Sequence, residues 1–409
     1  MAANPPADPA TPSGVGSPAA LLHTCRKPYS RHMKLAFTPT DPASIGVEWE
    51  LALVDATTGQ LTPAAPRLLD RVEDPDSGPI RREYLTCMVE LVSGVHRRVA
   101  DAMGDLGASL ATLRNLLGED VVPLGVGAHP FSIAAAQSHF EVERYQVVAD
   151  ENGWWGRQMV TMGTHVHVGV DDSAKALPIT TGLATLAPFF IALAGSSPYW
   201  QSDDTSFASN RTMLFQQLHT NGLPIPMQSW EEFQTYVTDL EDVGMISRLG
   251  EIRWDVRPSS FGTVENRLSD SVPTLAELGA ITALTQCAAA WLSAELDDGR
   301  RPPLLAPWFL QENKWRAARY GVEAEIINPD AGPRILPLRD SLHGWLDRLA
   351  PYARRLGCEA ELSVCAELAD TGPAYARMRR EFERSADLRT VVGLLADETG
   401  ADAPSNLRS

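Results

Sequence analysis

Charged side chains alternate with apolar ones along residues 251–270, a pattern typical of two adjoining strands. The charged residues of this segment are Arg253, Asp255, Arg257, Glu265 and Arg267. Successive side chains of a strand point to opposite faces, so a hairpin would gather these charges on one face. Arginines bind phosphate and carboxylates bind cations, which favours a metal and phosphate site. From this segment alone, a solvated hairpin face is an equally good interpretation.

Glu48 and Glu50 add two carboxylates to one face of a predicted strand that begins near Ser44. At the i, i+2 spacing of about 6.5 Å, their charges repel by about 2.5 kcal/mol at an effective dielectric near 20. Such a pair is tolerable on a wet surface and unfavourable in a pocket without a cation. Glu83 and Glu90 are seven residues apart, so a bend or bulge is needed for both to reach one site.

His165 and His167 share one face of the predicted strand GTHVHVGV, whose valines cover the other face. A hydrogen-bonded structural role is the usual explanation of a lone histidine. A pair at this spacing favours metal ligation by at least one of the two.

Helices are predicted beside these strands. Apolar periodicity indicates helices at residues 99–117, 173–195, 273–297, 311–321, 338–357 and 373–396, with a further strand at 121–130. In the helix 311–321, Arg316 and Arg319 are neighbours on one face and could bind phosphate or carboxylate, or face solvent. The polar loop that leads to Arg211, within residues 201–226, is a candidate substrate-facing loop.

Composition describes a globular chain with an acidic surface. Its 409 residues carry a formal net charge of -17, which argues against nucleic-acid or anionic-membrane partners. We find no apolar run of about 18 to 20 residues, the length of a membrane span. Five scattered cysteines fit a reducing cytoplasm.

We predict a disordered extension at 1–40, a single catalytic domain at 41–398 and a flexible tail at 399–409.

Five motifs, in this order, resemble the carboxylate-amine ligases of the type 2 glutamate-cysteine ligase group. The motifs are GVEWE with LALVD, EYLTCMVEL, GTHVHVGV, WDVRPSSFGTVENRLSD and ENKWRAARYG. The resemblance runs from about Ser44 to about residue 395. It implies an α+β fold like that of glutamine synthetase, in which an antiparallel sheet curves into a funnel with helices packed on its outer face.

The resemblance also implies roles for individual residues. The expected metal ligands are Glu48, Glu50, Glu90, His167 and Glu265. Arg257, Arg267 and Glu265 are expected to be catalytic. Contacts to the nucleotide are expected from Arg257, Arg267, Arg316 and Arg319, and contacts to the other substrates from Arg211 and Glu83. Trp49 is expected to point away from the site, and Cys87 to be structural.

A carboxylate-rich site with few histidines and no thiolates suits Mg2+ or Mn2+. The resemblance implies an ATP-dependent ligase that forms an amide through an acyl phosphate. Glutamate and cysteine are its expected substrates, with weak glutamate-cysteine ligase activity, and a homodimer is expected. Three alternatives stay open: a metal-dependent hydrolase that uses the HxH pair and the glutamates, a phosphotransferase of related fold, and a binding protein with a decayed site.

Overall fold

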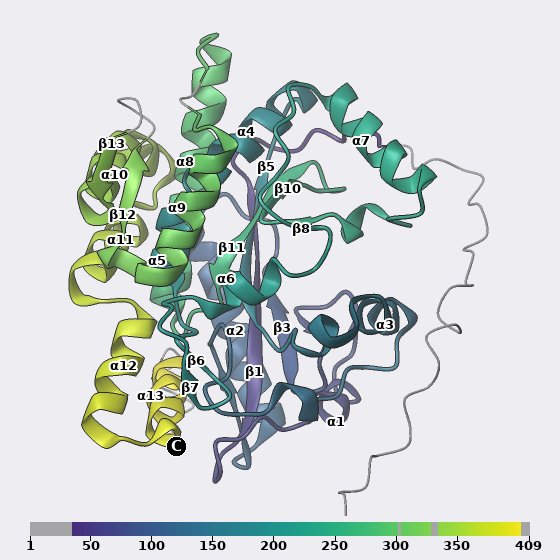
Figure 1. Cartoon of the computed structure of the whole chain (residues 1–409), viewed down its shortest axis with the longest axis vertical. Coiled ribbons are helices and arrows are strands. Elements are labelled where there is room, and N and C mark those ends of the chain that lie inside the picture. The colour runs from purple at the N-terminus through teal and green to yellow at the C-terminus, as the bar shows by residue number, and fades with distance from the viewer. Residues whose placement is uncertain (1–34, 302–303, 329–333, 402–409) are drawn as a thin grey trace, which may run out of the picture.

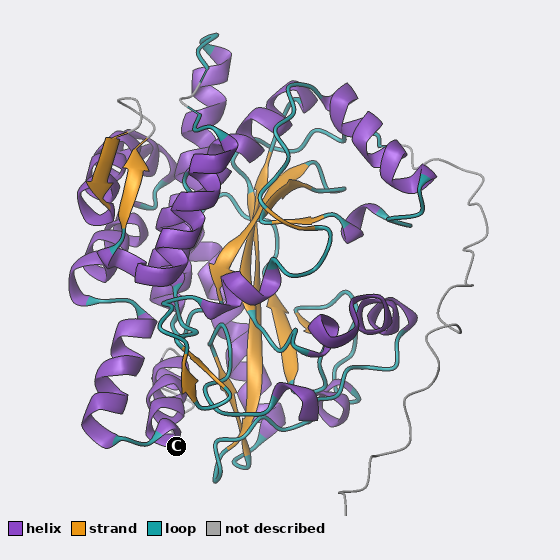
Figure 2. Ribbon diagram, in the orientation of Figure 1, coloured by secondary structure: helices purple, strands orange, loops and turns teal. Residues whose placement is uncertain are grey.

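A computed structural model of the chain describes residues 35–301, 304–328 and 334–401. A central sheet separates two groups of helices (Figures 1 and 2). Helices α5, α8, α9, α10 and α11 lie together on one side of it, and α3 and α7 lie on the other. The mixed α+β class is therefore confirmed.

The central sheet contains seven strands in the order β10-β11-β5-β1-β3-β2, and β4 also pairs with β1. Each of these pairings is antiparallel, as predicted. The strands are β1 (Ile45–Asp55), β2 (Ile80–Arg82), β3 (Met88–Val92), β4 (Val121–Leu124), β5 (Gly163–Gly169), β10 (Val256–Pro258) and β11 (Thr263–Asp270).

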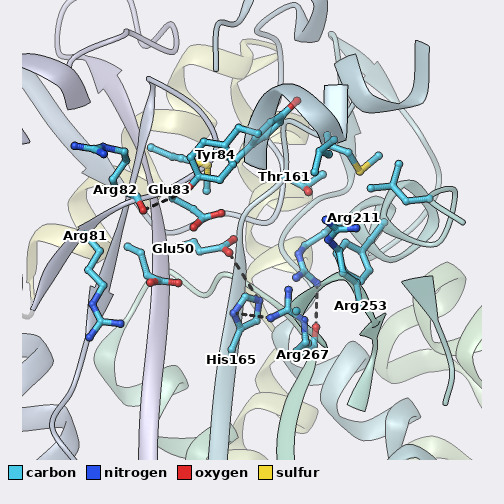
Figure 3. A pocket seen from close by; sticks show the side chains of 18 of the residues that line it. Glu50, Arg81, Arg82, Glu83, Tyr84, Thr161, His165, Arg211, Arg253 and Arg267 are labelled. Atoms are coloured by element: carbon cyan, nitrogen blue, oxygen red, sulfur yellow. Dashed lines mark hydrogen bonds and ion pairs between the residues drawn. The ribbon is translucent and has the colours of Figure 1, made fainter. Parts of the chain in front are cut away.

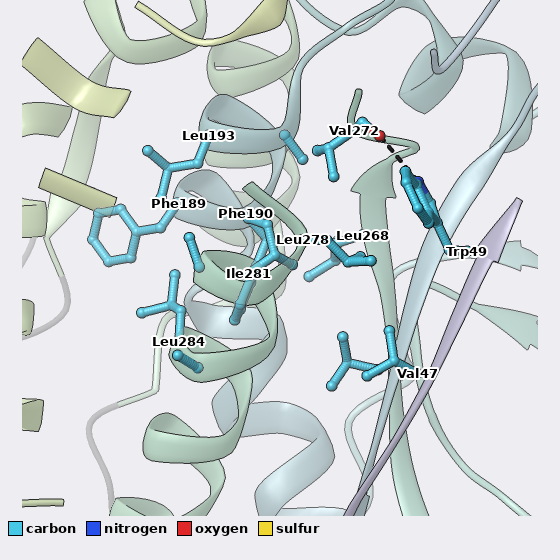
Figure 4. Close-up of a cluster of buried hydrophobic side chains, with 14 of the residues drawn as sticks. Val47, Trp49, Phe189, Phe190, Leu193, Leu268, Val272, Leu278, Ile281 and Leu284 are labelled. Atoms are coloured by element: carbon cyan, nitrogen blue, oxygen red, sulfur yellow. Dashed lines mark hydrogen bonds between the residues drawn. The ribbon is translucent and has the colours of Figure 1, made fainter. Parts of the chain in front are cut away.

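One face of the sheet is apolar and buried. On β1, Val47, Trp49 and Leu51 are fully buried and alternate with the glutamates. The Trp49 indole Nε1 donates to the Val272 carbonyl at 3.0 Å (Figure 4), so Trp49 points away from the glutamate face, as predicted. Burying a large apolar side chain stabilises the fold by about 1.5–3 kcal/mol. The apolar residues of β1 therefore determine which of its faces packs against the core.

Four helices pack on the apolar face: α2 (Val99–Leu117), α4 (Ser173–Thr185), α5 (Ala187–Ala194) and α8 (Leu275–Asp297). The prediction of a single helix at 173–195 is wrong, because this segment forms two helices, α4 and α5, that meet at a bend of 54°. Pro188 is the second residue of α5, and it has no backbone N–H to donate to the preceding turn. From the sequence we found no apolar run of the length of a membrane span, but by length and composition helix α8 could cross a membrane. In the structure, 89% of its most apolar window is buried inside the protein.

The C-terminal part adds α9 (Pro307–Tyr320), α10 (Leu338–Leu356), α11 (Glu359–Thr371), α12 (Ala374–Ser385) and α13 (Leu388–Ala401), with the hairpin β12 (Glu325–Asn328) and β13 (Arg334–Pro337). The predicted helix 373–396 is two helices, since Ala386 between them has a positive φ of 53°. Helix α13 continues through the buried Thr399, so the tail predicted from residue 399 begins too early. Residues 402–409 lie outside the described part.

The N-terminal boundary of the folded part also differs from the prediction. Most of the predicted extension, residues 1–34, lies outside the described residues. Leu35 and Phe37, however, pack against a cluster around α7 (Trp230–Asp242), and the Leu35 carbonyl accepts from Trp230 Nε1 at 3.2 Å. The packed chain therefore begins before residue 41.

The charged segment 251–270 is a broken strand followed by a hairpin. Asp255 interrupts it: β9 (Arg253–Trp254) pairs in parallel with β8 (Asn221–Gly222), whereas β10 pairs with β11. The prediction did not include the elements α1 (Ala65–Leu69), α3 (Glu143–Arg157), α6 (Asn210–Phe215), β6 (Tyr199–Trp200) and β7 (Asp203–Asp204).

Candidate active site

Strand register brings the polar residues of the sheet together on the face opposite the core. His165 lies opposite Glu48, and Glu50 lies opposite Glu90. Glu265 lies between His167 on one neighbour and Arg257 on the other. Side chains directly opposite in an antiparallel pair have Cβ atoms about 4.5–5.5 Å apart, so four separate sequence motifs form one continuous polar surface.

A cavity of about 450 Å³ opens over this surface. One wall carries Glu50, Glu83 and Glu90 beside His165, and the Glu50 and Glu83 carboxylates point toward one another (Figure 3). Glu83 reaches the cavity because residues 83–87 turn between β2 and β3, which is the bend that the sequence required. The opposite wall, which we call the arginine wall, consists of Arg211, Arg253, Arg257 and Arg267.

Two glutamates of this wall have raised pKa values, because burial and neighbouring carboxylates disfavour their charged forms. Burial and the charge of Glu83 raise the pKa of Glu50 to about 8, although Arg211 opposes the shift. Burial, together with Glu48, raises the pKa of Glu90 well above its usual value. Buried carboxylates that repel one another in this way are stabilised by a bound cation.

Glu48 joins the two histidines. Its carboxylate oxygens lie 3.0 Å from His165 Nδ1 and 3.3 Å from His167 Nε2. Burial raises the pKa of Glu48, but hydrogen bonds from His165 and His167 outweigh burial and hold this pKa below its usual range. Glu48 is therefore ionised and fixes the orientation of both rings.

The orientation of His165 fits a metal ligand. When Nδ1 donates to Glu48, Nε2 keeps its lone pair. This Nε2 atom is buried, has no hydrogen-bond partner among the described residues, and lies 3.8 Å from Glu50 Oε1. A ring nitrogen held by a carboxylate on its far side is the usual arrangement of a metal-binding histidine.

Two groups of side chains have ligand atoms close enough to share an ion. In each group the atoms lie within 4.8 Å of one another. One group is Glu48, Glu90 and His165, and the other is Glu48, His167 and Glu265. The two groups contain four of the five predicted metal ligands together with His165, and Glu48 belongs to both groups. Glu50 belongs to neither group.

Glu265 links the acidic groups to the arginine wall. Its carboxylate accepts from Arg257 Nε at 2.7 Å and also from Arg267 Nη1. Burial raises the pKa of Glu265, but Arg257 and Arg267 outweigh burial and hold it well below its usual value. Arg267 lies within a register shift between β11 and β5, and its Nη1 is 3.4 Å from His165 Nδ1.

Arg211 reaches the cavity from α6, as expected for a residue of the 201–226 segment. Phe215 and Leu218 from the same segment also line the cavity. Ser209 caps α6 by accepting from Thr212 N, and its hydroxyl donates to Asp270 at 2.7 Å. The loop therefore contributes to the site, as predicted.

Two arginines predicted on the site, and one aspartate of the alternating charged segment, lie elsewhere. Arg316 and Arg319 do not line the cavity: Arg316 pairs with Glu312 at 2.7 Å beside a separate hollow, and Arg319 donates to the Ser206 carbonyl. Both lie on the outward side of α9, which the periodicity of the helix could not reveal. Asp255 also turns away from the cavity, because the strand breaks there, and its carboxylate accepts from Lys314 Nζ at 2.6 Å.

Sequence reasoning missed several residues that line the cavity. They are Asp76, Arg81, Arg82, Tyr84, Met88, Tyr145, Val148, Met159, Thr161, Phe215, Leu218, Arg248 and Gly250. Arg253 was noticed in the alternating segment but was not assigned a role. The others lie on β2, β3, α3 and α6 and in segments outside the β-strands and α-helices. Cys87 is buried, and burial raises its pKa to about 12, consistent with the predicted structural role.

A family comparison agrees with this geometry. Residues 44–393 match the family model described as glutamate-cysteine ligase family 2. The chain belongs to this family. The resemblance inferred from the five motifs is therefore confirmed, and with it the prediction of an ATP-dependent ligase; the hydrolase and phosphotransferase alternatives are not favoured.

Two bacterial relatives show how closely glutamate-cysteine ligase family 2 proteins match this chain. A protein of Micrococcus luteus named "Putative glutamate--cysteine ligase 2" is 46% identical over 387 residues, which cover 92% of this chain and 96% of the relative. A protein of Arthrobacter sp. (strain FB24), named "Putative glutamate--cysteine ligase 2-1", is 45% identical and covers 88% of this chain and 97% of the relative. The chain therefore spans nearly the full length of these relatives.

Solved structures share the fold of this glutamate-cysteine ligase family 2 protein. A glutamate–cysteine ligase of Francisella tularensis in complex with AMP has a TM-score of 0.63 at 12% identity, covering 89% of this chain and 93% of that one. A bifunctional glutathione synthetase from Pasteurella multocida also has a TM-score of 0.63, at 14% identity, covering 88% of this chain and 52% of that one. At these identities the likeness establishes the fold alone.

Proposed function

We propose that the protein joins the side-chain carboxylate of glutamate to the amine of cysteine, using ATP. The observation that carries this proposal is the single cavity with two chemically opposite walls. Acidic residues with histidines suit a metal-bound nucleotide, and the arginine wall suits phosphate and carboxylate groups. The names of the bacterial relatives support glutamate and cysteine as substrates.

In this proposal Glu48, Glu50, Glu90 and His165 would hold Mg2+, with His167 and Glu265 beside them. The donor set fits: hard carboxylate oxygens dominate, and one histidine nitrogen is buried and without a partner among the described residues. Mn2+ suits the same donors. When bound, the ion would supply positive charge that neutralises phosphate oxygens.

The arginine wall would act on the phosphates and on the substrate carboxylates. Arg257 and Arg267, aligned by Glu265, would stabilise negative charge on the transferring phosphoryl group. Arg211 and Glu83 would orient a glutamate substrate by its carboxylate and its ammonium group. Because these groups are fixed before the substrate arrives, they cost little reorganisation during reaction.

The bond changes then follow from the substrates. A glutamate carboxylate oxygen attacks the γ-phosphorus of ATP, and ADP leaves, which forms an acyl phosphate. The cysteine nitrogen attacks the acyl carbon, phosphate leaves, and the nitrogen loses a proton to give an amide. This route needs no covalent nucleophile from the protein. The funnel curvature of the sheet and the homodimer stay predictions.

ADP release should depend on both amino acids. With Mg2+ and ATP, we expect purified protein to release ADP at a substantial rate only when glutamate and cysteine are both present, and EDTA should stop the release. The measurement is coupled ADP detection against amino acids offered singly and in pairs. Phosphate release with neither amino acid present would favour hydrolysis, and stable phosphorylation of glutamate alone would favour a phosphotransferase.

A further inference from the structure

The motif ENKWRAARYG contributes no side chain to the cavity, although it is one of the five motifs that define the family resemblance. Its arginines face outward, as described above, but Lys314 does not. We infer that the buried ion pair between Lys314 and Asp255 positions the arginine wall, so that Lys314 acts on phosphoryl transfer without touching a substrate. This inference rests on the proposed function.

Lys314 and Asp255 form an ion pair that is almost completely shielded from water. Lys314 Nζ lies 2.6 Å from Asp255 Oδ2, and the two side chains are 2% and 5% exposed. Such a pair contributes little net stability compared with apolar residues of the same size, but removing one partner leaves an uncompensated buried charge. The pair therefore acts as a strong geometric constraint between α9 and the broken strand.

Asp255 lies at the junction of the segments that carry the arginines. It separates Arg253 on β9 from Arg257 on β10. Its backbone carbonyl accepts from Arg267 N at 2.8 Å, and its backbone N–H donates to the Gly222 carbonyl at 2.7 Å. A shift of Asp255 would thus move three of the four arginines of the wall.

Helix α9 also supports the fourth arginine. The Ala318 carbonyl accepts from Ala208 N at 2.8 Å and from Ser209 N at 3.0 Å. Ser209 is the N-cap of α6, which carries Arg211 as its second residue. One helix therefore braces both segments from which the arginine wall projects.

Helix α9 is itself held firmly in place. Asn313, next to Lys314, donates from Nδ2 to the Ile327 carbonyl and accepts at Oδ1 from Ile327 N, both at 2.8 Å. Through these two hydrogen bonds the Asn313 side-chain amide pairs with the backbone of β12, as a neighbouring strand would. The helix can therefore hold Asp255 at a defined position rather than follow it.

Lys314→Met tests the inference, because methionine fills a similar volume without the charge. The unpaired Asp255 carboxylate would then compete for Arg211, on which it already acts electrostatically, and for other guanidinium groups of the wall. We expect kcat to fall about 100-fold, the effect of a displacement near 1 Å. We also expect the KM for ATP to rise about 10-fold, and the KM for cysteine to stay unchanged.

Two variants separate positioning from stability. Lys175→Met removes a mostly buried lysine from its ion pairs with Asp171 and Asp297, away from the cavity, and should lower thermal stability while kcat is kept. Lys314→Met with Asp255→Asn removes both charges, and should recover at least about 10-fold in kcat over Lys314→Met. The double variant also provides a test if the single variant does not fold.

The outcomes decide between the two roles. The positioning role is overturned if folded Lys314→Met protein keeps the wild-type kcat and ATP affinity while only its melting temperature falls. Calorimetric titration with ATP gives a readout that does not need turnover. If the wild-type protein forms no amide, the proposed function fails on its own, and a weaker ATP affinity of Lys314→Met would still support the positioning role.

Discussion

Glu48→Gln should reduce kcat by much more than 100-fold and should abolish stabilisation by Mg2+. Glu48 is the one carboxylate common to the two groups of potential ligands, and it orients both histidines. Loss of a side chain that orients a metal ligand lowers metal affinity or activity about 10- to 100-fold. Glu48 is expected to be a metal ligand and also to orient other ligands, so its loss should have a larger effect. Glutamine preserves the shape and removes the charge.

Kinetics and thermal unfolding, each with and without Mg2+, measure this effect. For the wild type, Mg2+ at 100 times its Kd should raise the free energy of unfolding by about 2.7 kcal/mol, and the variant should show no rise. Glu119→Gln, at an exposed position after α2, is a control with the same change in charge. A Glu48→Gln protein with a wild-type response to Mg2+ would contradict the metal assignment.

Arg267→Lys should lower kcat by about 1,000-fold, the lower end of what an arginine at a transferring phosphoryl group contributes. Lysine keeps the charge but loses the planar fork. Nη1 of the Arg267 guanidinium donates to Glu265 and lies 3.4 Å from His165 Nδ1, and the side chain lines the cavity. The same variant should weaken ATP binding much less than it lowers kcat, because the arginine is expected to act mainly on charge in the transition state.

Single-turnover measurement of ADP formation, compared with ATP affinity, checks this prediction. Arg384→Lys, at a 72% exposed side chain paired with Glu381, is the matched control and should behave as wild type. A loss for Arg267→Lys that appears only as a higher KM for ATP would contradict a role in phosphoryl transfer and indicate simple nucleotide binding.

Strand alternation predicted which side chains of the central strands share the polar face. Glu48 and Glu50, His165 and His167, and Glu265 and Arg267 each follow the two-residue period of a strand, and the structure places all six on the polar face. The apolar residues between them identify the buried face equally well. The alternation along each strand does not predict the order of the strands, because long-range packing determines which strands are neighbours.

Residues outside regular strands could not be placed in the same way. Asp255 fits the alternation, but a break in the strand sends it to Lys314 instead of the cavity. Arg316 and Arg319 share a helix face, yet the packing of α9 decides that this face points outward. Glu83 reaches the cavity from a turn, and Arg211 reaches it from the start of a helix. Periodicity does not place such residues, so the family resemblance assigned both to the site.

In the proposed reaction the protein activates a carboxylate by phosphorylation before the amine attacks. Glutamate labelled with 18O in its side-chain carboxylate tests this most directly. We predict that, for each amide formed from ATP and cysteine, one labelled oxygen appears in the released phosphate, as measured by mass spectrometry. Amide and ADP formed with no label in the phosphate would contradict the acyl-phosphate route.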